Sequence, residues 1–548
     1  MPVFTSRYPS VPVPKTGIIQ TLFEAVEQNK NVDRVCYVDA LTGKELTFKH
    51  IKDMTYRFGA GLQDICGFQR GDVLAIYAPN AVDYAVPVFG TLVAGGIISP
   101  ANPLYTKEEL AHQLRETKAK IIIAHPMNVE TAFEAADIVG LDKTKVFVFG
   151  DNVVKGAEPY TKKLLGNRVA EPADFQSPEQ ARETIAFLCF SSGTTGKSKG
   201  VMTTHGNLVS NIFQYSAMEH EALYKKETAR ILGILPFFHI FGLTVVLHAP
   251  LYMQRPVYVL PRFELEQFCA TVQNYRITFS CVVPPVLLQL AKSPTVDKYD
   301  LSSLDALLSG AAPLDADLAA EAQKRLGNVK IKQAYGLTET TPAACVQAGD
   351  HIVPGSSGLL CPSMYAKVVN EDGKELGVGE RGELWLKGPN IMKGYLNRPQ
   401  ETAYCIDTEG FFHTGDVAII DENGHIFIVD RIKELIKYKG FQVAPAELEG
   451  ILLKHKDVLD CAVIGVYDRE QVTEIPRAYI VTKPGVEQNE KTTEIIKKFV
   501  AEKVITYKRI QSVVYREQIP KSATGKILRN VLRKEVKEEE EARRASKL

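Results

Sequence analysis

The amino-acid sequence predicts an α/β protein with a large N-terminal domain and a smaller C-terminal one. The chain has 548 residues, more than one hydrophobic core usually serves, so two or more domains are expected. Between residues 18 and 310, short apolar runs alternate with amphipathic helical patterns, which is typical of βα units and largely parallel sheets. Between residues 355 and 430 the character changes: residues 383–387 and 425–429 alternate apolar and polar, with turn sequences at 371–373 and 422–424, which predicts a small antiparallel β-unit.

Strands of the large domain are predicted where short apolar runs are flanked by helical patterns. Those before the middle of the chain cover residues 73–77, 96–99, 121–124, 146–149 and 185–190. Those after it cover residues 231–235, 257–260, 279–283, 304–308 and 329–332. The longest apolar segment, residues 84–101, is interrupted by prolines and glycines, so it is expected to form a core helix or a strand pair and not a membrane span.

The C-terminal part is predicted to be a short α/β segment. Strands are expected near residues 460–466 and 477–481, and a helix over residues 493–504. We place the domains at residues 1–432 and 433–545. The last three residues, Ser546, Lys547 and Leu548, form a peroxisomal address. Localisation in the peroxisome and binding to the peroxisomal import receptor are therefore expected.

Composition excludes several classes of protein. Sixty-five basic residues balance 65 acidic ones, so the net charge gives no reason to expect nucleic acid or an anionic membrane as a partner. The nine cysteines include no C-x-x-C pair, which argues against a zinc site or a disulfide framework and fits a reducing compartment. The first 17 residues contain four prolines and no apolar core, so no signal peptide is expected.

The sequence between residues 188 and 200 predicts a polyphosphate site. An apolar strand ends there in a loop of serines, threonines, glycines and lysines. Glycines let the backbone approach an anion, N–H and hydroxyl groups donate hydrogen bonds, and a lysine adds positive charge. Gly196, Lys197 and Ser198 match the P-loop pattern, but Ser191 stands where its first glycine should be. We predict a nucleotide-phosphate loop outside the P-loop NTPases; the alternative is a flexible linker.

Three further strings offer groups suited to a nucleotide, although each also has a plain structural explanation. Tyr335 presents a flat face for a base, and Glu339 a carboxylate for a hard cation. Asp416 could accept hydrogen bonds from paired ribose hydroxyls, or could simply end a turn. His239 lies between aromatic residues, where a core histidine is also expected.

Two strings in the C-terminal part carry lysines in defined places. Residues 433–442 are basic with apolar interruptions, which also fits a strand edge guarded by lysines. The loop at residues 520–529 presents Lys526 just before a predicted helix. Taken alone, it is an ordinary helix N-terminus.

Spaced in this order, the strings closely resemble the adenylate-forming superfamily of acyl-CoA ligases, luciferases and peptide-synthetase adenylation domains. The resemblance extends over residues 20–535, and residues 433–449 look most like the plant 4-coumarate–CoA ligases and their fungal and insect relatives. It implies a large domain of stacked α/β sheets with a β-barrel-like unit, followed by a small mobile domain. It also implies two half-reactions. A carboxylic acid and Mg-ATP give an acyl-adenylate, from which the thiol of coenzyme A displaces AMP.

The resemblance assigns residues to the first half-reaction. Those implied for the phosphates are Ser191, Ser192, Gly193, Thr194, Thr195, Gly196 and Lys199. The other implied nucleotide contacts are Ala334, Tyr335, Gly336, Thr338, Asp416, Arg431 and Lys433. Glu339 is implied to bind Mg²⁺. Lys526 is implied to bridge the carboxylate and the α-phosphate, where its ammonium group lowers the repulsion between two anions.

For the second half-reaction, the resemblance implies a rotation of the C-terminal domain about Lys433. Lys526 then leaves, and the opposite face, with Lys437, Lys439, Gly440 and Gln442, turns to the active site. Arg262 takes the place of a lysine that contacts coenzyme A in plant relatives. His239 is implied to close the pocket in the first step and to open the thiol route in the second.

The implied acyl pocket contains Ile240, Phe241, Leu308, Gly310 and Ala334. Plant hydroxycinnamate ligases carry a lysine at the position of Leu308 and a tyrosine at that of Phe241, and the usual glycine is replaced by Ala334. Because a pocket without polar partners cannot compensate for the desolvation of a phenol, we expect an apolar acid. Cinnamate, phenylacetate and a medium-chain fatty acid are the candidates.

Four alternatives stay open from sequence. The chain could be a 4-coumarate–CoA ligase proper, with the phenol recognised in another way. It could be a stand-alone adenylation enzyme that loads a carrier protein, or a luciferase-like monooxygenase. A non-catalytic nucleotide-binding scaffold is the last alternative, and its hallmark would be the loss of Lys526 or Glu339, both of which are present.

Overall fold

The computed structural model describes residues 3–28, 31–191, 198–220, 223, 225–327, 329–349, 352–439, 441–468, 471, 473–522 and 525–545. The chain divides into two compact units. The large unit comprises Val3–Ala366 and Leu386–Phe412, and the small unit comprises Met1–Pro2, Lys367–Trp385 and His413–Leu548. The boundary expected at residue 432 stays a prediction.

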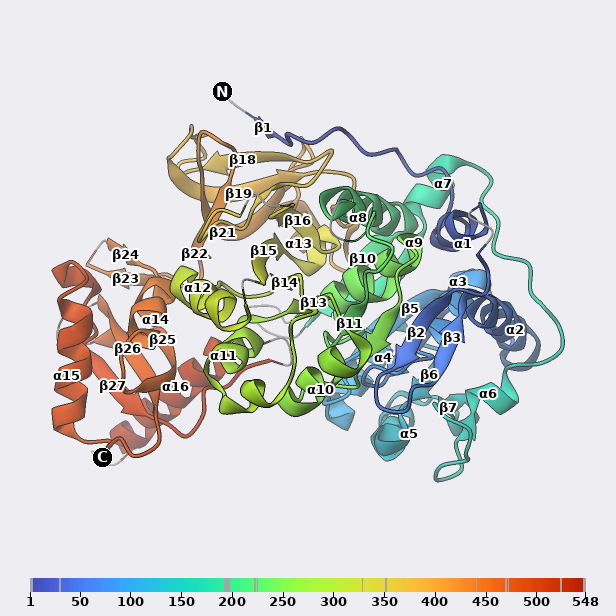
Figure 1. Cartoon of the computed structure of the whole chain (residues 1–548), viewed down its shortest axis with the longest axis horizontal. Coiled ribbons are helices and arrows are strands. Elements are labelled where there is room, and N and C mark those ends of the chain that lie inside the picture. The colour runs from blue at the N-terminus through green and yellow to red at the C-terminus, as the bar shows by residue number, and fades with distance from the viewer. Residues whose placement is uncertain are drawn as a thin grey trace. The chain divides into compact units, whose positions relative to one another are not determined.

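The first sheet of the large unit has eight strands and supplies the ends of the predicted phosphate loop (Figure 1). Its order is β20 (Gly394–Tyr395), β10 (Lys199–Thr204), β9 (Ile185–Ser191), β5 (Ile97–Ala101), β4 (Val73–Tyr77), β6 (Ile121–Ala124), β7 (Val146–Val148) and β8 (Glu158–Pro159). The strands from β9 to β8 are parallel, whereas β10 and β20 are each antiparallel to their neighbours. Strands β4, β6 and β7 are buried along their whole length, as expected where helices cover both sides.

The second sheet of the large unit has nine strands. Its order is β17 (Leu359–Leu360), β16 (Ala343–Val346), β15 (Lys330–Gly336), β14 (Ala306–Ser309), β13 (Phe279–Val282), β11 (Ile231–Gly233), β12 (Val257–Val259), β2 (Val35–Asp39) and β3 (Glu45–Thr47). The strands from β15 to β2 are parallel. The short strand β1 (Phe4–Thr5) pairs separately with Tyr365 and Ala366.

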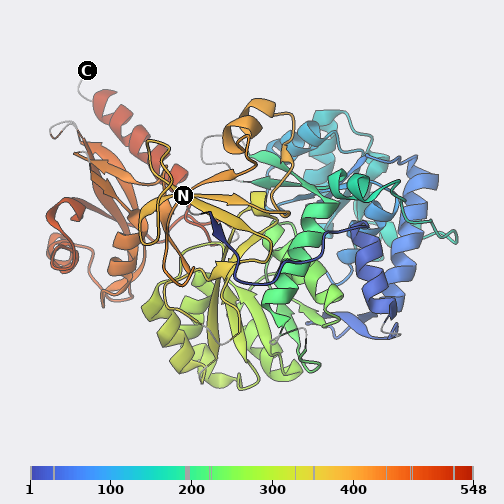
Figure 2. The same ribbon diagram turned by 90° about the horizontal axis from the view of Figure 1, so that it is seen from above.

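Crossover handedness places the helices of this second sheet. The connections β12–β13, β13–β14 and β14–β15 all run in one direction across the sheet, through α10 (Leu265–Tyr275), α11 (Pro284–Lys292) and α12 (Ala316–Arg325). Right-handed crossovers therefore put these three helices on one face (Figures 1 and 2). The connection β11–β12 runs the opposite way, through the π-helix Gly242–His248 and α9 (Ala249–Tyr252), and lies on the other face. This second face also contacts α8 (His205–Met218).

The remaining helices of the large unit complete its core. They are α1 (Ile18–Gln28), α2 (Phe48–Cys66), α3 (Ala85–Val93), α4 (Lys107–Thr117), α5 (Val129–Val139), α6 (Tyr160–Lys163), α7 (Pro178–Glu183) and α13 (Pro399–Cys405). Helices α4 and α5 bury their apolar stripes on β4 and β6. Capping residues set several starts: the side chain of Thr106, for example, accepts a hydrogen bond from the backbone of Glu109, whose carboxylate bonds back.

The small unit contains three sheets. One has the order β18 (Tyr365–Val369), β19 (Arg381–Lys387), β21 (Phe412–Ile420) and β22 (Ile426–Arg431), counting the strands that lie mostly in this unit. A hairpin follows, β23 (Ile436–Tyr438) and β24 (Phe441–Val443), and then the sheet β25 (Val458–Asp468), β26 (Thr473–Thr482) and β27 (Ser512–Tyr515). The helices are α14 (Pro445–Leu453), α15 (Glu490–Ala501) and α16 (Arg529–Ala545). Side chains of α14 and α15 pack on one face of the three-stranded sheet, and those of α16 on the other.

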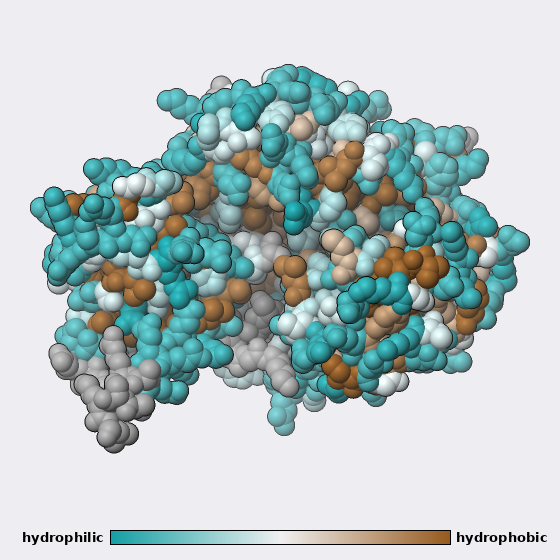
Figure 3. Space-filling view, turned by 90° about the horizontal axis from the view of Figure 1, so that it is seen from below, coloured by the Kyte–Doolittle hydropathy of each residue, from teal (hydrophilic) through white to brown (hydrophobic). Residues whose placement is uncertain are grey.

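The predicted α/β class is confirmed, and most predicted strands occur within a residue or two. Two details differ. The helix expected over residues 493–504 is α15, which begins earlier because the side chain of Asn489 caps it by accepting from Thr492 N–H. Residues 84–101 form helix α3 followed by strand β5. In the part of the chain that is described, no helix is long and apolar enough to span a membrane, and hydrophilic side chains cover most of the face in Figure 3.

Candidate functional site

The predicted phosphate loop joins two antiparallel strands. Strand β9 ends at Ser191, β10 begins at Lys199, and these two residues are register partners. The two ends of the loop therefore lie side by side. The predicted phosphate ligands between them lie outside the described residues: Ser192, Gly193, Thr194, Thr195 and Gly196.

A tyrosine links this loop to the predicted cation ligand. The ammonium group of Lys199 lies 4.9 Å from the ring centre of Tyr395 and forms an ion pair with Glu401. The hydroxyl of Tyr395 donates a hydrogen bond to Oε1 of Glu339, 2.8 Å away. Burial, reinforced by the negative charge of Glu339, raises the pKa of Tyr395. The structure thus places Lys199 and Glu339 around one protonated tyrosine.

Sequence reasoning missed Tyr395 and Glu401. Neither belongs to a string with a recognisable pattern, and Tyr395 reaches the site because β20 pairs with β10, where it is the register partner of Val201. That pairing joins segments far apart in the chain. No local signal in the sequence could have shown it.

Glu339 fits a hard cation that arrives with a polyphosphate. Its side chain is largely buried, and one oxygen receives the Tyr395 hydroxyl. Among the described residues there is no group of three or more His, Cys, Asp or Glu side chains that could hold a metal. Mg²⁺ is commonly bound by one or two carboxylates, with phosphate and water oxygens completing an octahedron. A single carboxylate beside a phosphate loop matches that mode of binding.

Tyr335, Gly336 and Thr338 lie at the turn from β15 to β16. Strand β15 ends at Gly336, and Thr338 begins the short 3₁₀-helix Thr338–Thr340, which also contains Glu339. A Cβ atom on Gly336 would lie 1.9 Å from the backbone oxygen of Pro342. Only glycine allows this approach, so the turn that carries these residues depends on it.

The structure brings three of the predicted acyl-site residues together. A Cβ atom on Gly310 would lie 2.9 Å from Cε1 of Phe241 and 3.5 Å from the carbonyl oxygen of Ala334. Ile240 and Leu308 are buried as well. The assignment of these residues to an acyl pocket stays a prediction.

His239 and Arg262 differ in their surroundings. His239 lies two residues before Phe241, and its Nδ1 accepts a hydrogen bond of 3.3 Å from the Phe241 N–H, so it lies at the edge of the predicted acyl site. Arg262 has an 80% exposed side chain that pairs with Glu264 at 2.6 Å. Within the described chain, no hydrogen bond or ion pair joins Arg262 to another predicted site residue.

The small unit brings together the predicted ribose ligands and the predicted adenylation lysine. Asp416 and Arg431 are register partners on β21 and β22, and their side chains form an ion pair of 3.1 Å. Burial lowers the pKa of Lys526 to about 8, and the positive charge of Arg431 adds to this, while Glu434 and Asp416 oppose it. Lys526 therefore titrates closer to neutrality than an ordinary lysine.

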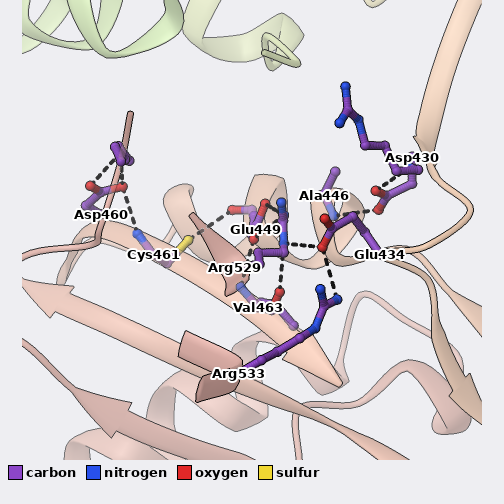
Figure 4. Close-up of polar contacts among 11 residues, drawn as sticks. Asp430, Glu434, Ala446, Glu449, Asp460, Cys461, Val463, Arg529 and Arg533 are labelled. Atoms are coloured by element: carbon purple, nitrogen blue, oxygen red, sulfur yellow. Dashed lines mark hydrogen bonds and ion pairs between the residues drawn. The ribbon is translucent and has the colours of Figure 1, made fainter. Parts of the chain in front are cut away.

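The loop that carries Lys526 is closed on itself by hydrogen bonds. Ser522 N–H donates to the carbonyl oxygen of Lys526 at 2.8 Å, and Lys526 N–H donates to Ser522 Oγ at 3.2 Å. Before the loop, Lys521 pairs with Asp460 of β25 at 2.6 and 2.9 Å. Residues on the two sides of the loop are therefore joined, and its entrance is anchored on β25 through Asp460, which Figure 4 labels.

The exit of the loop is anchored by Arg529, the first residue of α16. Its guanidinium group makes two 2.7 Å hydrogen bonds to the carboxylate of Glu449 and one of 3.1 Å to the Val463 carbonyl (Figure 4). Glu434 accepts from Arg533 at 3.0 Å and lies 3.8 Å from Arg529. The segment just after Lys433 is thus tied to the helix that follows Lys526. Sequence reasoning missed Arg529, Glu449 and Glu434.

The residues implied for thioester formation lie on the hairpin β23–β24. Lys437 and Gln442 are register partners, and both are exposed. Lys439 is exposed too, and its backbone N–H donates to Thr473 Oγ1 at 2.7 Å. Among the described residues, no hydrogen bond or ion pair joins this hairpin to Lys526. Gly440 lies outside the described residues, and Lys433 is exposed.

Comparison with protein families gives two matches. Residues 23–396 match the family described as "AMP-binding enzyme", and residues 447–526 match "AMP-binding enzyme C-terminal domain". Among curated proteins, the chain is 39% identical to "Probable 4-coumarate--CoA ligase 1" of Dictyostelium discoideum, over 97% of each chain. It is 37% identical to "4-coumarate--CoA ligase 1" of Petroselinum crispum, over 97% of this chain and 96% of the relative.

Solved structures agree with this placement. The crystal structure of ATP-bound MatB from Rhodopseudomonas palustris matches with a TM-score of 0.82 and 28% identity, over 94% of this chain and 98% of that one. The anthranilate CoA ligase AuaEII in complex with anthranoyl-AMP matches with a TM-score of 0.85 at 24% identity, over 96% of this chain and 98% of that one. The second match concerns the fold alone.

Proposed function

Because this chain belongs to the AMP-binding enzyme family of AMP-forming acid–thiol ligases, we propose that it couples ATP cleavage to the formation of an acyl-CoA thioester from an apolar carboxylic acid. The acid would be an aryl acid related to cinnamate or phenylacetate, or a medium-chain fatty acid. The observation that carries the choice of acid is the set of buried apolar side chains of Ile240, Phe241 and Leu308, with the ring of Phe241 against Gly310.

Each unit carries residues that we assign to ATP. In the large unit, the loop from Ser191 to Lys199 would receive the β- and γ-phosphates, and Tyr335 would contact adenine. In the small unit, Asp416 would accept hydrogen bonds from the ribose hydroxyls and Arg431 would hold it in place, consistent with their 3.1 Å ion pair. The similarity to ATP-bound MatB, 28% identical over 94% of this chain, supports ATP as the nucleotide.

Mg²⁺ would be held by Glu339, oriented by Tyr395, and would neutralise phosphate charge when bound. Lys526 would supply an ammonium group between the substrate carboxylate and the α-phosphate. This group stabilises the charge that develops during attack, and its removal should slow adenylation by about 10²–10³-fold.

In the second half-reaction the thiol of coenzyme A would attack the acyl carbonyl and AMP would leave. The exposed residues Lys437, Lys439 and Gln442 of the small unit would serve this step, with Arg262 of the large unit as a further contact for coenzyme A. A rotation about Lys433 would exchange the two sets of residues.

The test is direct synthesis with purified protein. Mg-ATP, coenzyme A and one acid from a panel are incubated, and AMP and acyl-CoA are quantified; the panel is hexanoate, decanoate, palmitate, phenylacetate, cinnamate and 4-coumarate. We expect acyl-CoA from one apolar class and its loss in Lys526→Ala. Preference for 4-coumarate by kcat/KM would show a 4-coumarate–CoA ligase proper. Adenylate without thioester would favour a carrier-loading enzyme, and light with luciferin and oxygen a luciferase-like one.

We also propose that the protein acts in the peroxisome. The support is the C-terminal tripeptide of Ser546, Lys547 and Leu548, which the peroxisomal import receptor reads. A fusion with a fluorescent protein at the N-terminus should co-localise with a peroxisomal marker. Deleting the last three residues should disperse it, and an unchanged distribution would exclude this address.

A further inference from the structure

A fully buried ion pair in the large unit has no role in the chemistry above. The ammonium group of Lys332 lies 2.5 and 2.6 Å from the two carboxylate oxygens of Glu219. The side chains are 1% and 0% exposed. Burial raises the pKa of Glu219, and the charge of Lys332 opposes that shift. Burying charges is costly even when they are paired, so we asked what the pair does at this position in the fold.

The register of the second sheet puts this pair next to the predicted acyl site. Cys281, Leu308 and Lys332 are partners on the parallel strands β13, β14 and β15, and therefore point to the same face. Gly310, directly after β14, and Ala334 on β15 come two residues later. Since side chains alternate between faces, they lie on that face too, one row further on.

Three residues of helix α8 and its C-terminal end, spaced one turn apart, contact the sheet on this face. Asn211 accepts from and donates to the backbone of Ala343, at 3.1 and 2.8 Å. One turn later the hydroxyl of Tyr215 lies 4.0 Å from Sγ of Cys281, and after another turn Glu219 meets Lys332. Because Ala343 is the register partner of Gly336, these contacts run from the predicted nucleotide end of β15 to the buried Lys332 near its start.

The register of β15 sets the distance between the pair and the position that we assign to the adenylate. Lys332 lies four residues before Gly336, where the adenylate would lie. At about 3.3 Å per residue this is about 13 Å, enough for a cinnamoyl or medium-chain acyl group.

We propose that the Lys332–Glu219 pair closes the far end of the acyl site and limits the length of the acyl group. This rests on the proposed ligase function and refines its substrate class. An apolar chain that reaches the pair cannot push the two groups apart, because each would be left as an uncompensated buried charge. Leu308, beside Lys332, contributes bulk but no charge. Long-chain fatty acids are therefore excluded, and aryl acids and fatty acids of medium length fit.

The test compares saturated fatty acids from hexanoate to palmitate in acyl-CoA synthesis. The variant K332A/E219A removes both charges and shortens both side chains. Relative to the wild type, its ratio of kcat/KM for tetradecanoate to that for octanoate should rise at least about 10-fold, because one or a few added methylene contacts change this ratio by about that factor. The variant K332M/E219L fills the space without charge and should keep the wild-type length profile.

The matched control is the ion pair of Lys367 with Glu375 in the small unit, 2.8 Å apart. The variant K367A/E375A should leave the length profile unchanged. Thermal melting of each variant verifies folding. If K332A/E219A does not fold, the wild type still decides, because efficient use of palmitate would overturn the proposal.

Other outcomes also overturn it. A folded K332A/E219A enzyme with the wild-type profile would show that the pair does not bound the site. A wild-type preference for 8-hydroxyoctanoate over octanoate, lost in K332M/E219L, would show that the pair binds a polar group instead of ending the site. Absence of acyl-CoA from every acid would refute the proposed function itself, a result distinct from an unchanged length profile.

Discussion

The pH dependence of adenylation gives the sharpest test of Lys526. Its pKa is lowered from 10.5 to about 8, first by burial and then by Arg431. If the ammonium form is required, the active fraction falls from about 90% at pH 7 to about 10% at pH 9, so kcat/KM for ATP should drop by about 10-fold over this range. The measurement is ATP–pyrophosphate exchange with a saturating acid, followed from pH 6 to pH 10.

The variant Lys526→Arg is the control for this assignment. A guanidinium group stays protonated throughout the range, so whatever activity it retains should not fall at high pH. A fall in activity caused by unfolding can be distinguished from one caused by deprotonation of Lys526. Between pH 8 and 10.5 the unfolded chain binds more protons at Lys526 than the folded protein, so this residue makes the protein more stable as pH rises. A wild-type rate that stays constant to pH 9, or an equal fall in Lys526→Arg, would refute the reasoning.

Three further predictions concern single contacts. Arg529→Met leaves the buried Glu449 unpaired and should lower the free energy of unfolding by about 3–5 kcal/mol in denaturant titrations; R529M/E449M should recover most of this, and equal losses would contradict it. Tyr395→Phe removes the donor that orients Glu339 and should raise the Mg²⁺ concentration for half-maximal adenylation by about 10-fold, whereas an unchanged Mg²⁺ titration would argue against that role. Gly336→Ala puts a Cβ atom 1.9 Å from a backbone oxygen, so this clash should abolish adenylation. If the variant melts like the wild type, the steric cause is excluded.

Local sequence patterns were enough to predict most strands of the large unit. Buried parallel strands such as β4 and β6 are short apolar runs whose character depends little on their neighbours. The order of these strands could not be read in the same way. The pairing of β10 with β20, for instance, joins residues near 200 with residues near 395. The sequence of neither segment indicates that the other is its partner.

The residues of the candidate site also fall into two groups, those predictable from local sequence and those that depend on contacts between distant segments. Glu339, Asp416 and Lys526 stand in strings whose residue types match a nucleotide, so the sequence was enough to propose them. Tyr395 and Lys332 were missed because their roles come from what lies opposite them. The loss of a lysine at Leu308 was visible in the sequence, but the lysine beside it on the next strand becomes apparent only from the register of β14 and β15.

The small unit is built from separate pieces of chain, and this affects how relatives could be recombined. The backbone passes between the units after residues 366, 385 and 412. A gene fusion made at residue 432 would take Lys526 from one parent and Asp416 with Arg431 from the other, although all three belong to one compact body. It would also separate Asp430 from Ala446, whose N–H it accepts at 3.1 Å. Breakpoints at the ends of the two pieces of the small unit, Lys367–Trp385 and His413–Leu548, would instead take Asp416, Arg431 and Lys526 from the same parent.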